Sequence, residues 1–163
     1  MSFVKLREEE TKRPLILLFA EGTILKPRSI LTHYSIKAYI PAGNCVGLIS
    51  HWHEQGAEIV YCTSLKEKRI KIMTELLTKY GFLGSGLYYR GAGQEYKDIV
   101  NEVKPDILIE DDCKSIGGAR QMCITYADIH VKSKITSIVV PEFKGIDELP
   151  ADIAVLENYR RQK

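Results

Sequence analysis

The residues best suited to chemistry in this sequence are three consecutive acids, Glu110-Asp111-Asp112, which follow a short apolar run. Adjacent carboxylates repel one another, which costs stability unless a cation or strong hydrogen-bond donors compensate. Acids with perturbed pKa values also cluster at functional sites. We therefore favour a metal-binding or other functional role for these acids.

Two further polar segments also follow apolar runs. Glu21-Gly22-Thr23 comes soon after the run 15–19, and Thr63-Ser64 comes directly after the run 58–62. Taken singly, the first is a turn in which glycine supplies the conformational freedom, and the second is a helix N-cap. A helix N-terminus also favours an anion, so the second segment is a candidate anion site.

The elements that must position these residues alternate between short apolar runs and helical patterns. This alternation predicts the α/β class, as a single Rossmann-like domain with an open parallel five-stranded sheet and helices on both faces. Ligands of such sheets bind beyond the carboxyl ends of the strands, where the three polar segments converge. We expect strands at Leu15–Phe19, Glu58–Cys62, Leu87–Tyr89, Asp106–Ile109 and Ile135–Val140, and helices at about 44–55, 64–81, 96–103 and 147–159.

Length and charge limit the classes of protein. The 163 residues fit a single domain, 1–163, whose first 13 residues form a polar N-terminal segment. The net charge of +2 gives no strong nucleic-acid signal. The apolar run 15–20 is too short to span a membrane, and the four cysteines show no CxxC spacing, so a reducing, cytoplasmic setting is expected.

Taken together, the segments resemble the haloacid dehalogenase-like (HAD) superfamily of phosphohydrolases over residues 14–140. The first HAD motif, Asp-x-Asp-Gly-Thr after an apolar strand, aligns with Phe19-Ala20-Glu21-Gly22-Thr23. The second motif, a strand ending in Thr or Ser, aligns with Thr63-Ser64, and the acidic pair of the fourth with the run at 110–112. For the motif lysine we choose Lys97, with Lys104 as the alternative.

The resemblance implies a role for each aligned residue. In HAD phosphatases the first Asp attacks phosphorus, the second is a general acid and base, and the acidic pair helps to hold Mg²⁺. Mg²⁺ is therefore the expected cofactor. The catalytic candidates are Glu21, Thr63 and Lys97; the phosphate-binding candidates are Gly22, Thr63, Ser64 and Lys97; and the metal candidates are Glu21, Glu110, Asp111 and Asp112.

The sequence departs from the HAD pattern at the nucleophile position, which is Phe19. Phenylalanine has no carboxylate to attack phosphorus or bind a metal. We expect a phosphate- and Mg²⁺-binding domain with weak or no classical phosphatase activity, a pseudoenzyme. The alternatives are an active Mg²⁺-dependent phosphatase or nucleotidase that uses Glu21 and a water molecule, and a non-catalytic interaction module.

The segments between the motifs leave no room for a cap domain. A capless site suits a large phosphorylated substrate, or a homo-oligomer in which a subunit interface acts as the lid. Arg28, Tyr34 and Tyr39 are candidates for lining the entrance. The basic residues 66–71 are interpreted first as a solvated helix face and second as a patch that attracts phosphate, and Gly91-Ala92-Gly93 is a weak nucleotide signal.

Overall fold

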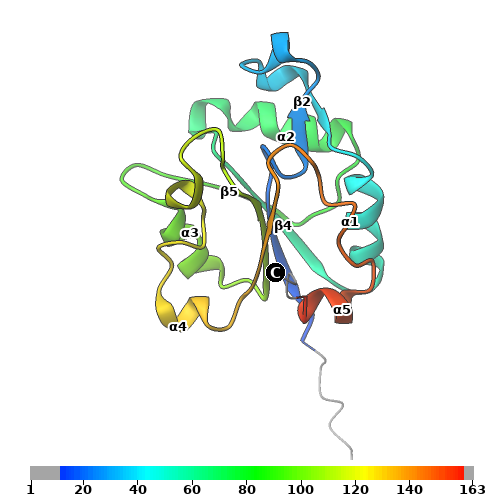
Figure 1. The fold of residues 1–163 in the computed structure, drawn as a ribbon, viewed down its shortest axis with the longest axis vertical. Coiled ribbons are helices and arrows are strands. Elements are labelled where there is room, and N and C mark those ends of the chain that lie inside the picture. Colours follow the sequence, from blue (N-terminus) through cyan, green and yellow to red (C-terminus); the bar gives the residue numbers. More distant parts are fainter. Residues whose placement is uncertain (1–11, 160–163) are drawn as a thin grey trace, which may run out of the picture.

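A central sheet of five parallel strands organises the computed structural model, which describes residues 12–159 (Figure 1). The strand order is β5-β4-β1-β6-β7, and Leu17 in the middle of β1 pairs with Val60 of β4 and Leu108 of β6. The predicted α/β class and parallel five-stranded sheet are therefore confirmed. The strands are β1 (Leu15–Phe19), β4 (Glu58–Thr63), β5 (Gly86–Tyr89), β6 (Ile107–Asp111) and β7 (Thr136–Val140).

Helices cover both faces of this sheet, because alternate strand residues feed two separate apolar clusters. Ile16 and Leu18 of β1 point into one cluster and Leu17 into the other. The first face carries α1 (Cys45–Glu54), α2 (Ile70–Lys79) and α5 (Ile153–Glu157), and the second carries α3 (Tyr96–Val103) and α4 (Ile129–Lys132). Of the helices within residues 12–159, none combines the length and apolar character that a membrane crossing requires.

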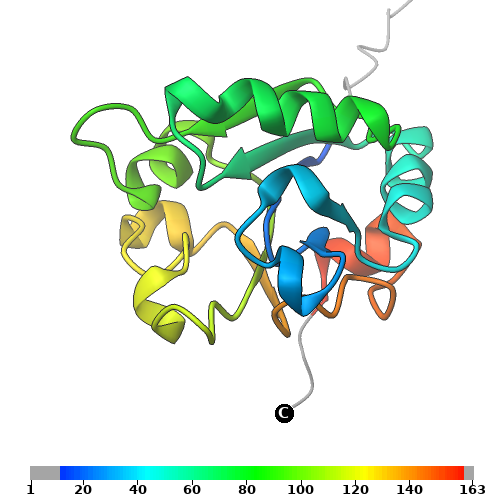
Figure 2. The same cartoon turned by 90° about the horizontal axis from the view of Figure 1, so that it is seen from above.

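Between β1 and α1 the chain forms a small antiparallel hairpin. Its strands are β2 (Leu25–Pro27) and β3 (Tyr39–Pro41), and two 3₁₀ turns, η1 (Ile30–Thr32) and η2 (Ile36–Ala38), form its tip. The sequence analysis predicted no strands here, because each strand has only three residues and one of the three is a proline. The hairpin lies above the sheet edge at which β1 ends (Figures 1 and 2). It therefore stands over the predicted site.

The C-terminal helix is shorter than predicted. Our expected helix of 147–159 begins only at Ile153, because Asp152 caps it by accepting from the amides of Ala154 and Val155. Pro150 therefore lies before the helix, not in its first turn. Its carbonyl accepts a hydrogen bond of 3.0 Å from the indole N–H of the buried Trp52, which ties this segment to α1.

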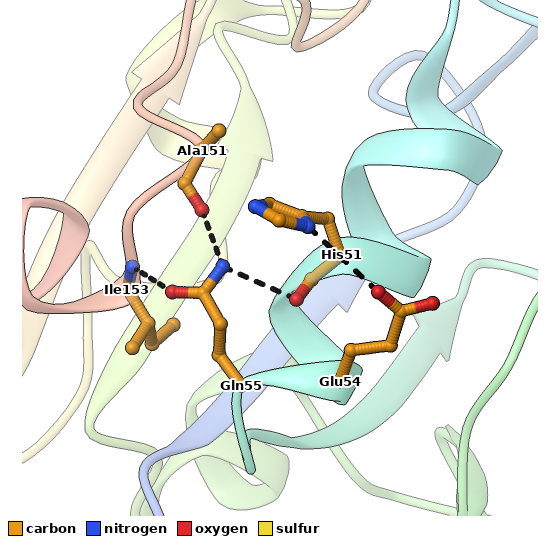
Figure 3. Close-up of polar contacts among 5 residues, drawn as sticks. All are labelled: His51, Glu54, Gln55, Ala151 and Ile153. Carbon is orange, nitrogen blue, oxygen red and sulfur yellow. Dashed lines mark hydrogen bonds and ion pairs between the residues drawn. The ribbon is translucent and has the colours of Figure 1, made fainter.

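Gln55, at the end of α1, makes a second link to the C-terminal segment (Figure 3). Its side-chain amide donates to the carbonyl of Ala151 at 2.8 Å and to that of His51 at 3.2 Å. Its side-chain oxygen accepts from the amide of Ile153 at 2.9 Å. One side chain thus joins two elements almost a hundred residues apart.

Replacement of Gln55 by alanine should lower stability modestly. The three hydrogen bonds are exposed, so their joint loss should reduce the free energy of unfolding by about 1 kcal/mol and Tm by about 2–4 °C. Thermal denaturation followed by circular dichroism measures this. Glu54→Ala is the control, because the contact of Glu54 with His51 is exposed and 3.8 Å long. An equal loss of stability in Gln55→Ala and Glu54→Ala would contradict the stabilising role of the Gln55 hydrogen bonds.

Candidate active site

The carboxyl ends of β1, β4 and β6 meet at one pocket of about 170 Å³. Parallel strands present these ends at the same edge, so segments far apart in sequence become neighbours. Acidic and aromatic side chains dominate its lining: Glu21, Asp111 and Glu142, together with Phe19, His33, Tyr39, Tyr96 and Phe143. The polar segments that the sequence analysis singled out thus come together here.

A tight turn after β1 brings Gly22 against Asp111. The amides of Ile24 and Leu25 both donate to the carbonyl of Ala20, which closes the turn. Gly22 has a φ of +85°, and a Cβ atom at this position would lie 2.7 Å from Oδ1 of Asp111. Glycine is required here both for its conformation and for this close approach.

Thr23 fixes the carboxylate of Asp111 from the same turn. Its hydroxyl donates to Oδ1 of Asp111 at 3.0 Å, and the amide of Cys113 donates to Oδ2 at 3.1 Å. Thr23 and Asp111 are both buried, so these bonds form away from water. Burial raises the pKa of Asp111, and the donors from Cys113 and Thr23 oppose that rise.

Glu21 is held by donors from the end of β4. Its Oε1 accepts from the hydroxyls of Thr63 and Ser64, each at 2.7 Å, and from the amide of Ser64 at 3.1 Å. Burial raises the pKa of Glu21, and hydrogen bonds led by that of Thr63 act in the opposite direction. Hydroxyls and an amide at a strand end form a ready anion cradle. In this structure, the carboxylate of Glu21 lies in that cradle.

Phe19 ends β1 as part of an aromatic stack. Its ring meets that of Tyr96 edge to face, with centroids 5.4 Å apart and an interplanar angle of 81°. The guanidinium of Arg90 lies 4.2 Å from the centroid of the Tyr96 ring. The position that aligns with a nucleophile is therefore packed against a hydrocarbon surface.

The three consecutive acids separate, because β6 extends further than predicted. Glu110 and Asp111 both belong to the strand, so their side chains point to opposite faces. Glu110 accepts from the amides of Cys123 and Ile124 within the second apolar cluster. Asp112 accepts through Oδ1 from the amides of Lys114 and Glu142, at 3.2 and 3.3 Å. Of the three acids, Asp111 alone is among the described residues that line the pocket.

Neither candidate lysine is among the described residues that line the pocket. The ammonium of Lys97 lies 3.0 Å from the carboxylate of Glu95, and this hydrogen bond raises the pKa of Lys97. Lys104 follows the end of α3 in a left-handed conformation. The described lining contains no arginine either, so its carboxylates face no fixed cation.

The sequence analysis missed several lining residues. Glu142 lies two positions after β7, and its carboxylate accepts from the amide and hydroxyl of Ser115, at 3.0 and 2.7 Å. Its position just past the end of a parallel strand could have identified Glu142 as a candidate site residue. Of the entrance candidates, Tyr39 lines the pocket, whereas Arg28 and Tyr34 are exposed outside it.

The donor set does not fit a Mg²⁺ site as arranged. Mg²⁺ requires several oxygen ligands in near-octahedral geometry. Phe19 supplies none, while the oxygens of Glu21 and Asp111 already accept hydrogen bonds from their neighbours. Within residues 12–159 no group of three or more His, Cys, Asp or Glu side chains is placed to hold a metal ion.

Comparisons with known proteins place the fold. No family model matches the chain, and no curated protein matches its sequence. Among solved structures, a chain of the Pnkp1/Rnl/Hen1 complex is 12% identical with a TM-score of 0.56, covering 82% of this chain and 48% of that one. The class C acid phosphatase from Bacillus anthracis is 13% identical with a TM-score of 0.52, covering 95% of this chain and 76% of that one.

A second structure, of the Pnkp1/Rnl/Hen1 RNA repair complex, has a TM-score of 0.53 at 14% identity; the match covers 82% of this chain. This chain spans less than half of the matched chain in either Pnkp1/Rnl/Hen1 structure. These likenesses and the strand order show that the chain has a HAD-like fold, as predicted.

The buried Glu110 should make stability depend on pH. Burial raises its pKa from 4.5 to about 7, against the opposing hydrogen bonds from Cys123 and Ile124. The folded state therefore holds a proton that the unfolded state releases, and the free energy of unfolding falls as pH rises from about 4.5 to 7. The loss should be at most about 3 kcal/mol.

Urea denaturation at half-unit pH steps measures this loss. Glu110→Gln cannot titrate and should show a flatter profile across that window, with Glu148→Gln on the exposed surface as the control. Equal slopes for the wild type and Glu110→Gln would show that Glu110 does not titrate in this window.

Proposed function

We propose that this domain is related to phosphohydrolases but does not catalyse classical HAD phosphatase turnover, because Glu21 occupies the phosphate cradle and Phe19 stands at the nucleophile position. The observation that carries this proposal is the set of three bonds from Thr63 and Ser64 to one carboxylate oxygen of Glu21. These are the donors that the HAD resemblance assigns to phosphate. Phosphate can use them only if Glu21 leaves.

The electrostatics of the pocket support the same conclusion. A phosphate ester brings negative charge to a pocket already lined by the carboxylates of Glu21, Asp111 and Glu142. Hydrogen bonds to a charged group contribute about 1.5–3 kcal/mol each, so displacing Glu21 from three donors is costly. Without a lysine or arginine in the described lining, no fixed charge offsets that cost.

The loss of the nucleophile acts separately from the closed cradle. Within residues 12–159, no free carboxylate replaces it at the end of β1. Phe19 packs on Tyr96, and the carboxylate of Glu21 is bound by Thr63. Removal of a covalent nucleophile from an enzyme typically lowers turnover by about 10⁴–10⁶. We infer a role in binding, in which any phosphate or Mg²⁺ enters only after Glu21 has moved.

A second candidate is hydrolysis by a water molecule that Glu21 activates. The raised pKa of Glu21 favours it, since a general base works best when its pKa approaches the working pH. Against it, the same carboxylate is bound to Thr63 and Ser64 and would have to release at least one of them.

The exposed tip of the hairpin supports a partner over the pocket. Ile30, Leu31 and Tyr34 are each more than 90% exposed, which is unusual for large apolar side chains. We infer that a large phosphorylated ligand or a second subunit covers this entrance.

Restoring the Asp-x-Asp pattern should create activity. Phe19→Asp/Glu21→Asp supplies a nucleophile and shortens the side chain that fills the cradle, so Mg²⁺-dependent hydrolysis of p-nitrophenyl phosphate should appear. The unaltered protein should not exceed the Phe19→Ala control, with or without Mg²⁺. Metal-dependent turnover in the unaltered protein that Glu21→Gln abolishes would establish the second candidate and overturn the first.

Removing the Glu21 carboxylate should open the cradle. Glu21→Ala frees the donors of Thr63 and Ser64, so inorganic phosphate at 10 mM should raise its Tm by several degrees more than it raises that of the unaltered protein. Glu142→Ala is the matched control, because it removes one negative charge from the pocket but leaves Glu21 bound. A phosphate response in Glu142→Ala equal to that in Glu21→Ala would contradict the cradle model.

A further inference from the structure

A second groove lies at the same edge of the sheet, beside the pocket. One wall is the segment that leads into α2, with Lys66 and the 3₁₀ turn η3 (Glu67–Arg69), and the other is the loop that follows Tyr89 at the end of β5. Figure 2 shows the start of the η3–α2 helix next to this loop. The groove is open to solvent and has a volume of about 810 Å³, against about 170 Å³ for the pocket at Glu21.

The charge of the groove is opposite to that of the pocket. Lys66, Lys68, Arg69 and Arg90 line it, and within residues 12–159 none of the four belongs to an ion pair. The groove is also lined by two acids, Glu67 and Glu95. Glu95 is paired with Lys97 at 3.0 Å, so only the carboxylate of Glu67 offsets the four cations. The groove therefore has a surplus of positive charge on both walls.

Arg90 adds a cation whose hydrogen-bonding capacity is not fully used by the described residues. Its guanidinium rests on the Tyr96 ring, yet its Nε is buried and has no hydrogen-bond partner among the described residues. A buried donor left unpaired costs about 1–3 kcal/mol, so such groups call for an explanation. The planar fork of a guanidinium matches phosphoryl oxygens in a bidentate arrangement.

We infer that this groove binds a small ligand with two or more phosphoryl groups. Its volume falls in the range of about 300–1,000 Å³ that is usual for small-molecule sites and exceeds what one phosphate ion needs. Cations on facing walls suit two anionic groups. The net charge of +2 for the whole chain favours a compact ligand over a long nucleic-acid strand.

The groove does not depend on the cradle at Glu21. Its cations belong to residues 66–69 and to Arg90, whereas the cradle uses Thr63 and Ser64. Arg90 and Phe19 contact the same Tyr96 ring, so the two sites are adjacent but use separate donors. Failure of one proposal therefore leaves the other standing.

Calorimetric titration of the full chain in EDTA with pyrophosphate, ADP and inorganic phosphate tests the inference. Pyrophosphate and ADP should bind at least tenfold more tightly than inorganic phosphate. Equal affinities for pyrophosphate and ADP would show that the phosphoryl groups alone determine binding. Tighter binding of ADP would show that the nucleoside also contacts the groove. No binding of either at 1 mM, or binding only of a single-stranded oligonucleotide, would overturn the inference.

Substitutions then locate the bound ligand. Arg90→Ala should weaken pyrophosphate binding at least tenfold, and Lys66→Ala/Lys68→Ala should do so without disturbing the ring contact of Arg90. Lys71→Ala is the control, because Lys71 is exposed on α2 and contacts Glu75 at 3.8 Å. Binding that survives both Arg90→Ala and the double lysine variant would refute this location.

Discussion

The carboxylate of Glu21 and the three donors at the end of β4 form the contact on which the rest of the site depends. Glu21 is half-buried, and withdrawing a carboxylate from water is costly unless donors satisfy it. Two hydroxyls and an amide do so here. The same bonds remove Thr63 and Ser64 from the reach of any other anion. Glu21, Thr63 and Ser64 thus form a closed intramolecular contact at the carboxyl end of the sheet.

The remaining geometry follows from how parallel strands end. The turn after β1 can approach β6 only because position 22 is glycine, and this approach seats Asp111 against Thr23. The two-residue period of β6 sends Glu110 to the opposite face, where it holds the loop at 123–124. The acids therefore divide between pocket and core, and the positive charge gathers in the neighbouring groove.

The sequence predicted the fold well because the apolar runs are long enough to identify each parallel strand. It also predicted that Glu21, Thr63 and Asp111 would meet at one edge, which the structure shows. The predictions that failed concerned the local structure around single site residues. The extension of β6 by two residues changed where Glu110 points, and the pairing of Lys97 with Glu95 depends on the start of α3.

Other features could not be read from residue types and spacing. The Glu21 side chain points toward Thr63 because of its rotamer, which the sequence does not specify. The basic groove joins residues 66–69 with Arg90, and only the pairing of β4 with β5 makes them neighbours. The hairpin at the entrance has strands too short for a period of two to be visible.

The most direct measurement is the chemical shift of the Ser64 backbone amide during a titration with inorganic phosphate, by ¹H–¹⁵N NMR. The titration uses the Lys66→Ala/Lys68→Ala variant, in which the neighbouring basic groove is weakened and the contact of Glu21 with Thr63 and Ser64 is retained. This amide already donates to Glu21, so its resonance should stay in place up to 20 mM phosphate. A saturable shift of the Ser64 amide at submillimolar phosphate would show that the cradle is open, and would contradict the account.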